Sequence, residues 1–551
     1  MSNFFWSTPT GRIIVTVIVG LSLTISARSA QEGRAQTFTV NQQKLSRLSI
    51  LDRNGEPIAE TISAFDLWFV PHDFWGVSPV NSRNNEHVPS KHSSEDTRRA
   101  LLLNALSDWP QVQSIVSDRL TSRNKSDTRQ KILAWAIDPI IAKKIATLNI
   151  AGLRLIERPA RHYPKGSLFA HPIGFVRLSD IQFGQEGLEL VANYKLRAPQ
   201  GKGERLGMPL QTTLDPEIQG LVRNTLQKGV ATYGAVGAAA VVVEVQSGAI
   251  RAMVSSPDFD PNDASTYRNP YQPERILNRA VAVNFPIGSL LAPLLVAHGI
   301  DTGRFQPTTV VNLGKGPLKI DKTIIRDTHP EETLSIAEIV AKSSNNGLAK
   351  VAMQLPIAEV QGLTKSLGIG ETLGISGLIG GVNHETIAWG EWTPGMQAEP
   401  GMHIETNLMQ VVKAYLPIAN GGVLKFVSIL NGTENHPEDR VFSADTTHSM
   451  RLMLETASGP TGTAPKAQAA GTRVAGKTAT VTASRLDDFS TPSKPTQGSS
   501  VAAFVGMAPA LNPQWLVGII FQFPQGSLRY SGETSAPVFS KIIHGILNPE
   551  K

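Results

Sequence analysis

Ser289 is a candidate reactive hydroxyl because of the pattern around it. The segment FPIGSLLAP, from Phe285 to Pro293, places Pro286 and Gly288 before this serine, and the apolar helical run LLAPLLVAHGI follows it. The pattern predicts a helix N-terminus at Ser289. Backbone N–H groups at a helix start lack intrahelical acceptors, so they can stabilise an anion. A serine at such a position is more often a helix cap, however, so the position alone assigns no reaction.

Two further polar segments follow Ser289 along the chain. KSSNNG, from Lys342 to Gly347, closes a helical pattern, and GKTAT, from Gly476 to Thr480, lies within a strand pattern. Each segment is uninformative on its own. The order of the three segments, together with the residues that flank them, forms a pattern far more specific than any single segment.

Composition excludes several other chemistries. The chain has 551 residues, 52 Lys and Arg against 46 Asp and Glu, and no Cys, which excludes thiolate zinc sites, disulfides and cysteine nucleophiles. The histidines lack HExxH spacing, and no block of Lys and Arg marks a nucleic-acid-binding arm. No metal and no organic cofactor is expected. The length indicates two to four domains.

The elements that must position these segments can be read from the sequence. A helix is expected at 214–230, where Asp215 and Pro216 form a typical start, and a hairpin at 238–254 turns at Gly248. Helices follow to about residue 420, and strands are expected at 472–483, 499–509 and 515–524 before a last helix at 535–547. This order predicts an α+β fold with a central antiparallel sheet and helices on its faces. Helical patterns also run through the region before residue 148.

The N-terminal region carries an apolar run, Ile13–Ala27, preceded by Arg12. Fifteen residues are short for a membrane span, which needs about 20, and they suit a signal-peptide core equally well. An uncleaved anchor and a cleaved signal therefore both remain open at this point, and a buried core helix is the third reading. Either of the first two exports the chain beyond residue 30.

The sequence resembles the class B penicillin-binding proteins, most closely the cell-division type, the septal peptidoglycan D,D-transpeptidases. The resemblance covers nearly the whole exported chain. It is carried by the three segments above and by the stretches LDRNGEPIA (51–59), RHYPKGSLFAHPIGFV (161–176), GQEGLEL (184–190), VEVQSGAIRAMVSSPDFDPN (243–262) and SAPVFSKIIHGIL (535–547).

The resemblance implies a mechanism. In that family a serine attacks the D-Ala–D-Ala carbonyl and forms an acyl-enzyme, and a lysine one helical turn later removes its proton. A Ser-x-Asn segment relays protons, a Lys-Thr-Gly strand binds the substrate carboxylate, and two backbone N–H groups form the oxyanion hole. Transferred to this chain, the matching positions are Ser289 as nucleophile and first oxyanion donor, Ser343 and Asn345, Lys477 and Thr478, and Thr480 as second oxyanion donor.

Two positions depart from the family pattern. Ala292 stands where the general-base lysine is expected, and Ala479 stands where the strand glycine is expected. A methyl group cannot accept a proton, and losing a general base lowers the rate by about 10²–10⁴-fold. The Ala479 methyl is expected to crowd the slot where a peptide or a β-lactam would lie.

The resemblance also implies an organisation and a location. We expect a cytoplasmic tail at 1–12, a transmembrane anchor or signal segment at 13–27, an elongated pedestal or dimerisation-type domain at 28–208 and a transpeptidase-like, β-lactamase-like domain at 209–551. A single-pass inner-membrane protein with its bulk in the periplasm follows. Implied ligands are peptidoglycan stem peptides and β-lactams, and implied partners are a SEDS-type glycan polymerase and division-complex proteins, with no nucleic acid.

Three functions remain open from the sequence. The first is a pseudoenzyme scaffold of septal peptidoglycan synthesis that binds without turnover. The second is an active but divergent D,D-transpeptidase whose base is displaced, which requires a titratable amine near Ser289. The third is a noncovalent β-lactam or muropeptide sensor.

Overall fold

The computed structural model describes ten stretches of the chain. These are residues 47–75, 95–121, 128–177, 182–197, 208–263, 273–370, 392–432, 438–482, 500–524 and 529–549. The predicted anchor or signal segment, Ile13–Ala27, lies outside them. Within the ten stretches, no helix combines the length and the apolar character needed to cross a bilayer.

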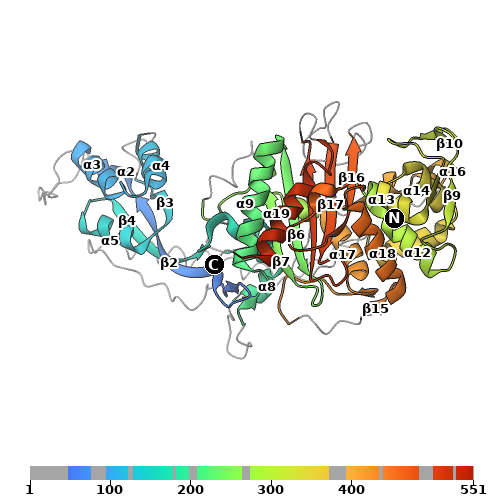
Figure 1. The fold of residues 1–551 in the computed structure, drawn as a ribbon. Coiled ribbons are helices and arrows are strands. Elements are labelled where there is room, and N and C mark those ends of the chain that lie inside the picture. The colour runs from blue at the N-terminus through green and yellow to red at the C-terminus, as the bar shows by residue number, and fades with distance from the viewer. Residues whose placement is uncertain are drawn as a thin grey trace, which may run out of the picture. The chain divides into compact units, whose positions relative to one another are not determined.

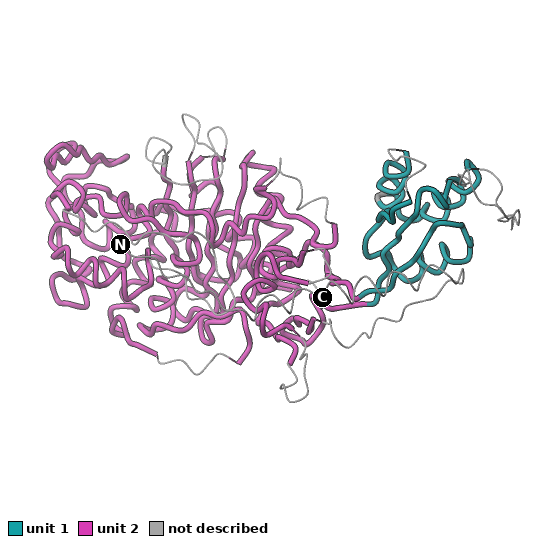
Figure 2. The backbone as a smooth tube through the Cα atoms, turned by 180° about the vertical axis from the view of Figure 1, so that it is seen from behind, with its two compact units in different colours: residues 1–42, 63–158 teal, residues 43–62, 159–551 magenta. Residues whose placement is uncertain are grey.

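The chain divides into two compact units (Figure 2). Unit 1 comprises residues 1–42 and 63–158, and unit 2 comprises residues 43–62 and 159–551. Strands β2 (Pro57–Phe69) and β4 (Leu153–His162) carry the chain across the sequence boundaries between the units. This division into units does not test the predicted domain boundary near residue 209, which stays a prediction.

Unit 1 has its own hydrophobic core. The core gathers Leu67 and Phe69 of β2 with Leu102 and with Leu133 of β3, all four fully buried. Around it lie α2 (Pro71–Trp75), α3 (Glu95–Ala105), α4 (Pro110–Thr121), β3 (Lys131–Ile137) and α5 (Pro139–Thr147).

The expected helical pattern before residue 148 is wrong for the segment KILAWAI. Residues Lys131–Ile137 form strand β3, which pairs antiparallel with β2 and aligns Trp68 with Ile132. Long-range pairing with a strand some sixty residues earlier decides this segment, and a local periodicity cannot report it.

Unit 2 is built on a five-stranded antiparallel sheet (Figure 1). Its strands lie in the order β16-β17-β18-β6-β7. The expected hairpin and the three expected late strands are confirmed, and their bounds are β6 (Gly237–Glu244), β7 (Ile250–Ser256), β16 (Ala475–Thr482), β17 (Ser500–Ala508) and β18 (Trp515–Gln522). β16 is an edge strand, so part of its backbone hydrogen-bonding capacity points away from the sheet.

Side-chain alternation gives the sheet two apolar faces. Helices α9 (Pro216–Tyr233) and α19 (Ser535–Leu547) bury Leu226 and Phe539 against one face. On the other face lies α17 (Leu408–Ala419), and its side chains, together with those of α12 (Ala292–Asp301), share a core with Ala479 and Val481 of β16. The predicted helices-on-both-faces arrangement is therefore confirmed.

Local capping explains why α9 begins where it does. The Asp215 side chain accepts hydrogen bonds from the N–H groups of Glu217 and Ile218, and Pro216 occupies the first helical position. The turn between β6 and β7 uses Gly248 at φ +72°, where the missing Cβ removes the penalty of a left-handed conformation.

The remaining elements of unit 2 are short. Near its start they are β1 (Ile50–Leu51), η2 (Gly166–Phe169), α6 (Ala170–Ile173), α7 (Gly187–Val191), α8 (Asn193–Leu196) and β5 (Leu210–Gln211). Between the two halves of the sheet they are η3 (Pro273–Arg275), α11 (Arg279–Ala282), β8 (Phe285–Pro286), η4 (Gly288–Leu291), β9 (Val310–Asn312), β10 (Leu318–Ile320), β11 (Thr323–Ile325), β12 (Thr333–Ser335), α13 (Ile336–Lys342), α14 (Asn345–Ala352), α15 (Ile357–Ser366), α16 (Pro394–Ala398), η5 (Pro400–Met402), β13 (Glu405–Thr406), β14 (Val423–Leu424), β15 (Asp439–Arg440), α18 (Ala444–Ala457) and η6 (Pro465–Ala467).

Candidate active site

A short strand pair and a tight turn hold Ser289. β8 pairs antiparallel with β13, and the Ile287 N–H donates to the Ile404 carbonyl at 2.9 Å. Gly288 then adopts φ +56°, and the chain enters η4 and continues into α12. Ser289 therefore lies in the first turn of a helical segment, directly after the β8–β13 pair and the Gly288 turn that fix its backbone.

Buried residues, nearly all of them apolar, flank Ser289 along the chain. From Val283 to Ala297 every residue except Ser289 is buried, and Ser289 is partly exposed. Ala292, one helical turn later, is only 4% exposed. The Ser289 hydroxyl makes no hydrogen bond to any residue that the structure describes. Among the described residues, therefore, no hydrogen-bonded group is in place to take the proton of the Ser289 hydroxyl.

Tyr415 of α17 also fixes the turn that carries Ser289. Its hydroxyl donates to the Leu290 carbonyl at 2.7 Å. Burial raises the pKa of Tyr415 well above its ordinary value, so the phenol stays a neutral donor. Nothing in the sequence around Tyr415 signalled this positioning role.

Ser343 lies at the junction of two helices. It ends α13 in the left-handed conformation, φ +56°, and Ser344 caps α14 by accepting from the Gly347 N–H at 2.9 Å. Ser344 also donates to the Asp327 carboxylate at 2.7 Å. These contacts fix the backbone on both sides of Ser343.

Lys477 of β16 completes a polar pair with Ser343. Its Nζ donates to the Ser343 Oγ at 2.7 Å and to the Thr478 carbonyl at 3.1 Å, and the residue is fully buried. Burial lowers the pKa of Lys477 to about 7, because the low-dielectric surroundings disfavour the ammonium form. Near neutral pH this amine therefore exchanges between charged and neutral forms.

The threonines of the same strand are held through their hydroxyls. The Thr478 Oγ1 lies 2.9 Å from the Thr463 Oγ1. The Thr480 Oγ1 accepts from the Ser531 N–H at 3.1 Å. Thr463 and Ser531 belong to no motif that the sequence analysis singled out, and only the fold brings them to the strand.

Ala479 lies beside the Ser289 turn. It is 4% exposed, and a Cβ built on Gly288 would lie 3.8 Å from its methyl group and 3.3 Å from Val481. The methyl group therefore occupies space between β16 and the segment that carries Ser289.

Asn345 is not part of the polar pair. It is exposed, and its side-chain amide donates to the Arg326 carbonyl at 2.9 Å. Lys342, the other lysine of these motifs, forms an ion pair with Glu331 at 3.1 Å. The structure thus joins Ser343 to Lys477 and Ala479 to the Ser289 turn, while Asn345 and Lys342 are engaged elsewhere.

The described residues include no cluster of His, Asp or Glu that could hold a metal ion.

Comparison with known proteins gives this geometry a context. Residues 238–544 match the family described as the penicillin binding protein transpeptidase domain, and residues 43–205 match the penicillin-binding protein dimerisation domain. The first match spans more than half of the chain, and it contains all three segments of the site.

The chain belongs to the class B penicillin-binding proteins of the division type.

Curated relatives of this family match along most of their length. The peptidoglycan D,D-transpeptidase FtsI of Escherichia coli K12 is 28% identical over 542 residues, which cover 94% of this chain and 86% of the relative. The probable peptidoglycan D,D-transpeptidase PenA of Neisseria gonorrhoeae is 28% identical over 528 residues, 91% of this chain and 84% of the relative.

A solved structure is similar to part of this chain in both sequence and fold. The TP domain of penicillin-binding protein 3 from Burkholderia pseudomallei is 29% identical, with a TM-score of 0.53. The match covers 61% of this chain and 95% of that chain.

Proposed function

We propose that this class B penicillin-binding protein is impaired in acylation and acts in septal peptidoglycan synthesis as a binding or scaffold protein. The observation that carries the proposal is the isolation of the Ser289 hydroxyl. It has no hydrogen-bonded partner among the described residues, and the buried Ala292 occupies the position expected for its base.

The expected loss is large. An unassisted serine hydroxyl is a weak nucleophile, and a positioned general base contributes about 10²–10⁴-fold to the rate. Where nucleophile and base act as one unit, removing one member removes most of the benefit of the other. Ser289 would then attack a D-Ala–D-Ala carbonyl or a β-lactam only slowly.

The retained polar groups support binding rather than turnover. Lys477 and Ser343 keep a mutual hydrogen bond, and the threonines of β16 keep fixed orientations. A carboxylate arriving at Lys477 would favour its ammonium form, so ligand binding above pH 7 should take up a proton. Noncovalent capture of a stem peptide or a β-lactam, the sensor reading, is consistent with this arrangement.

One observation favours an active alternative. The lowered pKa of Lys477, about 7, makes it an amine that can act as a base near neutral pH, and it touches Ser343. In this alternative, an active divergent D,D-transpeptidase, Ser343 would pass the Ser289 proton to Lys477. The alternative requires Ser343 to approach Ser289, and no hydrogen bond joins these two serines among the described residues.

We extend the proposal to location and partners. The segment Ile13–Ala27 would anchor the chain in the inner membrane, with the bulk of the protein in the periplasm. There it would meet peptidoglycan stem peptides, a SEDS-type glycan polymerase and division-complex proteins. The apolar run supports the anchor, and the relatives' names support peptidoglycan stem peptides as ligands.

The experiment is a crosslinking assay on the purified full chain. Lipid-linked substrate and a glycan polymerase supply uncrosslinked strands, and the product is analysed for stem-peptide crosslinks. The proposal expects no crosslinking above that of Ser289→Ala. Crosslinks that disappear in Ser289→Ala would overturn it, and loss of those crosslinks in Lys477→Met would support the active alternative.

A further inference from the structure

The chain contains four Asn-Gly pairs, and one of them has a geometry that the other three lack. The pairs begin at Asn54, Asn346, Asn420 and Asn431. In such a pair the glycine backbone nitrogen can attack the side-chain amide of the asparagine, because glycine has no side chain to obstruct the approach. All four pairs share this chemistry, so their surroundings must decide which of them reacts in the folded chain.

At Asn431 the reacting groups are already in contact. The Gly432 N–H donates to the Asn431 Oδ1 at 3.0 Å, and both residues are exposed. Because a C=O bond is about 1.2 Å long, the Gly432 nitrogen lies no more than about 4.2 Å from the Asn431 Cγ. Reacting atoms in a productive arrangement are about 3–3.5 Å apart, so a small rotation of the side chain closes the gap. Exposure lets water take part in the later steps.

The pair at Asn346 is held in a helix. Asn346 lies in the first turn of α14 and is 3% exposed, and its side-chain amide donates to the Gly316 carbonyl at 3.1 Å. The Gly347 N–H donates to the Ser344 Oγ at 2.9 Å. Attack at this pair would require the helix start to open, so the fold protects it.

The other two pairs direct their hydrogen bonds elsewhere. The Gly55 N–H donates to the Asp52 carbonyl at 3.1 Å, although Asn54 is exposed like Asn431. The Asn420 Oδ1 accepts from the Val423 N–H at 3.0 Å. Neither arrangement brings the glycine nitrogen to the amide of its own asparagine.

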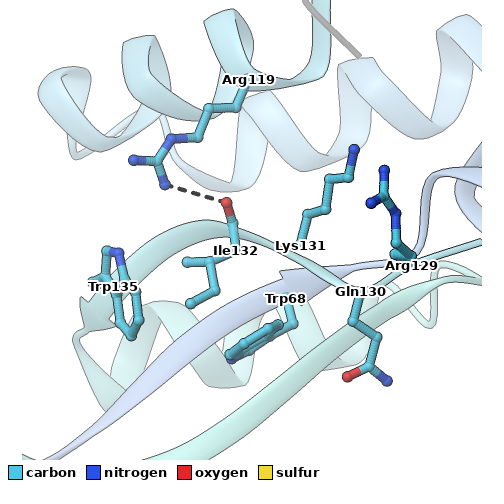
Figure 3. Close-up of a pocket in the computed structure, with 7 residues that line it drawn as sticks. All are labelled: Trp68, Arg119, Arg129, Gln130, Lys131, Ile132 and Trp135. Atoms are coloured by element: carbon cyan, nitrogen blue, oxygen red, sulfur yellow. Dashed lines mark hydrogen bonds between the residues drawn. The ribbon is translucent and has the colours of Figure 1, made fainter. Parts of the chain in front are cut away.

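An exposed glutamine supplies a reference within the same chain. Gln130 lines a pocket of unit 1, and Figure 3 shows its side chain pointing away from those of Arg129 and Lys131. Its amide carbon is one methylene further from the backbone, so attack by the next backbone nitrogen would close a six-membered ring in place of a five-membered one. The next residue is a lysine, whose side chain obstructs that approach. Gln130 is therefore an exposed amide without an assisting neighbour.

We propose that Asn431 is a site of spontaneous, intramolecular deamidation. The Gly432 nitrogen gives its proton to water or hydroxide and forms a bond to the Asn431 Cγ. The side-chain nitrogen takes up a proton and leaves as ammonia, and a cyclic succinimide remains. Water then opens the succinimide at either carbonyl and yields aspartate or isoaspartate at position 431. The proposal is independent of whether Ser289 is acylated.

The modification alters a contact between two distant segments of unit 2. The Asn431 N–H donates to the Gln211 carbonyl at 2.9 Å, and Leu430 forms an isolated strand bridge with Thr212. Either product adds a carboxylate at this point, and isoaspartate also inserts one extra carbon into the main chain. Ageing of the protein would therefore change how the segment before α9 is attached to the residues around Leu430.

The test is an ageing experiment on the full chain, followed by peptide mapping. The folded protein is incubated at mildly alkaline pH, and a protease that cuts after lysine then places the four pairs and Gln130 in five separate peptides. Deamidation is read as the mass difference between an amide and an acid. We expect Asn431 to react at least about tenfold faster than each of the other three pairs, with Gln130 unchanged. The Asn431 rate should rise with pH, because the Gly432 nitrogen must lose its proton.

Unfolding and matched variants separate the fold from the local sequence. In concentrated urea the hydrogen bonds of the fold are lost, so the four pairs should react at similar rates. Asn431→Gln should abolish the modification at this position, and incubation in water labelled with heavy oxygen should place the label in the Asn431 product. Asn54→Gln makes the same change at the other exposed pair and should leave the Asn431 rate as it was.

Two outcomes would overturn the proposal. One is an Asn431 rate in the folded chain that is no faster than the Asn54 rate, which would mean that the contact with Gly432 does not promote attack. The other is an equal lead of Asn431 in the folded and the unfolded chain. The lead would then come from the neighbouring sequence and not from the geometry of the turn.

Discussion

The transpeptidase-type site has a strand side, formed by β16 and Ser343, and a helix side, formed by the Ser289 turn. The two sides differ in whether their polar side chains are hydrogen-bonded. On the strand side, Lys477 and Ser343 are joined at 2.7 Å, and the hydroxyls of the neighbouring threonines are all engaged. On the helix side, the Ser289 hydroxyl has no hydrogen bond to any residue in the described stretches, and its chain neighbours from Phe285 to Ala297 are buried. This contrast underlies the proposal that the strand side, apart from Ala479, keeps its ligand-binding groups, whereas the helix side lacks a base because Ala292 stands in the lysine position.

The scaffolding of both halves is equally well built. The Ser289 turn is fixed by Tyr415 and by the β8–β13 pair, and Ser343 is fixed by the cap at Ser344. The proposed impairment therefore rests on two side chains, Ala292 on the helix side and Ala479 on the strand side, and not on a collapse of the fold. This is why restoring those two side chains is the sharpest way to remove the contrast.

The largest expected effect is a gain of acylation in Ala292→Lys with Ala479→Gly. A lysine one turn after Ser289 supplies a base, and a glycine opens the strand, so the acylation rate by a fluorescent penicillin should rise by about 10²-fold or more. The rate is measured by gel fluorescence over time. The same double variant with Ser289→Ala is the control and should not label. An unchanged rate in a folded double variant would mean that the missing side chains are not the cause.

The next effect is on stability and belongs to the strand side. Burial lowers the pKa of Lys477 to about 7, so between pH 7 and about 10.5 the unfolded chain holds a proton that the folded chain lacks. Stability therefore rises with pH in that window, by at most about 1.4 kcal/mol per pH unit from this group. Below pH 7 both states hold the proton, and the burial penalty is constant.

Lys477→Met removes this dependence. The variant should gain most over the original chain below pH 7, and its advantage should shrink as the pH rises toward 10. Urea unfolding at several pH values measures the difference. Parallel curves for the two proteins from pH 7 to 10 would contradict a buried, easily deprotonated amine.

A smaller effect is expected at the turn before the serine. Gly288→Ala adds a side chain at φ +56° and 3.3 Å from Val481. Gly303→Ala is the matched control, because Gly303 has φ +73° but nothing within 4 Å of its Cβ position. Both variants should lose about 1 kcal/mol from backbone strain, and Gly288→Ala should lose more because of the contact. Equal losses by thermal or urea unfolding would show that β16 does not press on this turn.

The smallest effect concerns the cap beside Ser343. Ser344→Ala and Ser443→Ala each remove an N-cap, of α14 and α18 respectively, at about 1 kcal/mol, and Ser344→Ala should cost somewhat more because it also removes the hydrogen bond to Asp327. Only Ser344→Ala disturbs the Lys477 partner, so only that variant should also weaken noncovalent ligand binding. Thermal shift with and without a β-lactam measures both quantities. Equal ligand effects in the two variants would remove the link between this cap and the binding half.

Sequence reasoning recovered elements with strong local signals. The helix beginning at Pro216, the hairpin turning at Gly248 and the last helix, Ser535–Leu547, all appear where capping and turn residues indicated. It failed at Lys131–Ile137, because that strand is decided by pairing with β2. Caps and turns depend on residues that are neighbours in the sequence, whereas strand pairing depends on residues far apart in it.

The structure brings together only some of the residues that the resemblance singled out, and their roles stay predictions. The resemblance indicated which residues matter, and the fold then placed Ser343 against Lys477. The resemblance did not predict that the Asn345 amide would donate to the Arg326 carbonyl. It also did not predict that Thr463 and Ser531 would form hydrogen bonds with the threonines of β16. These contacts join segments far apart in the chain, and no spacing rule reaches across such distances.

The measurement that tests the central claim most directly is labelling of the purified, unaltered chain by a fluorescent penicillin, beside Ser289→Ala. The account predicts no labelling of the folded protein above the Ser289→Ala background. Labelling that disappears in Ser289→Ala would contradict it, because Ser289 would then be activated despite Ala292.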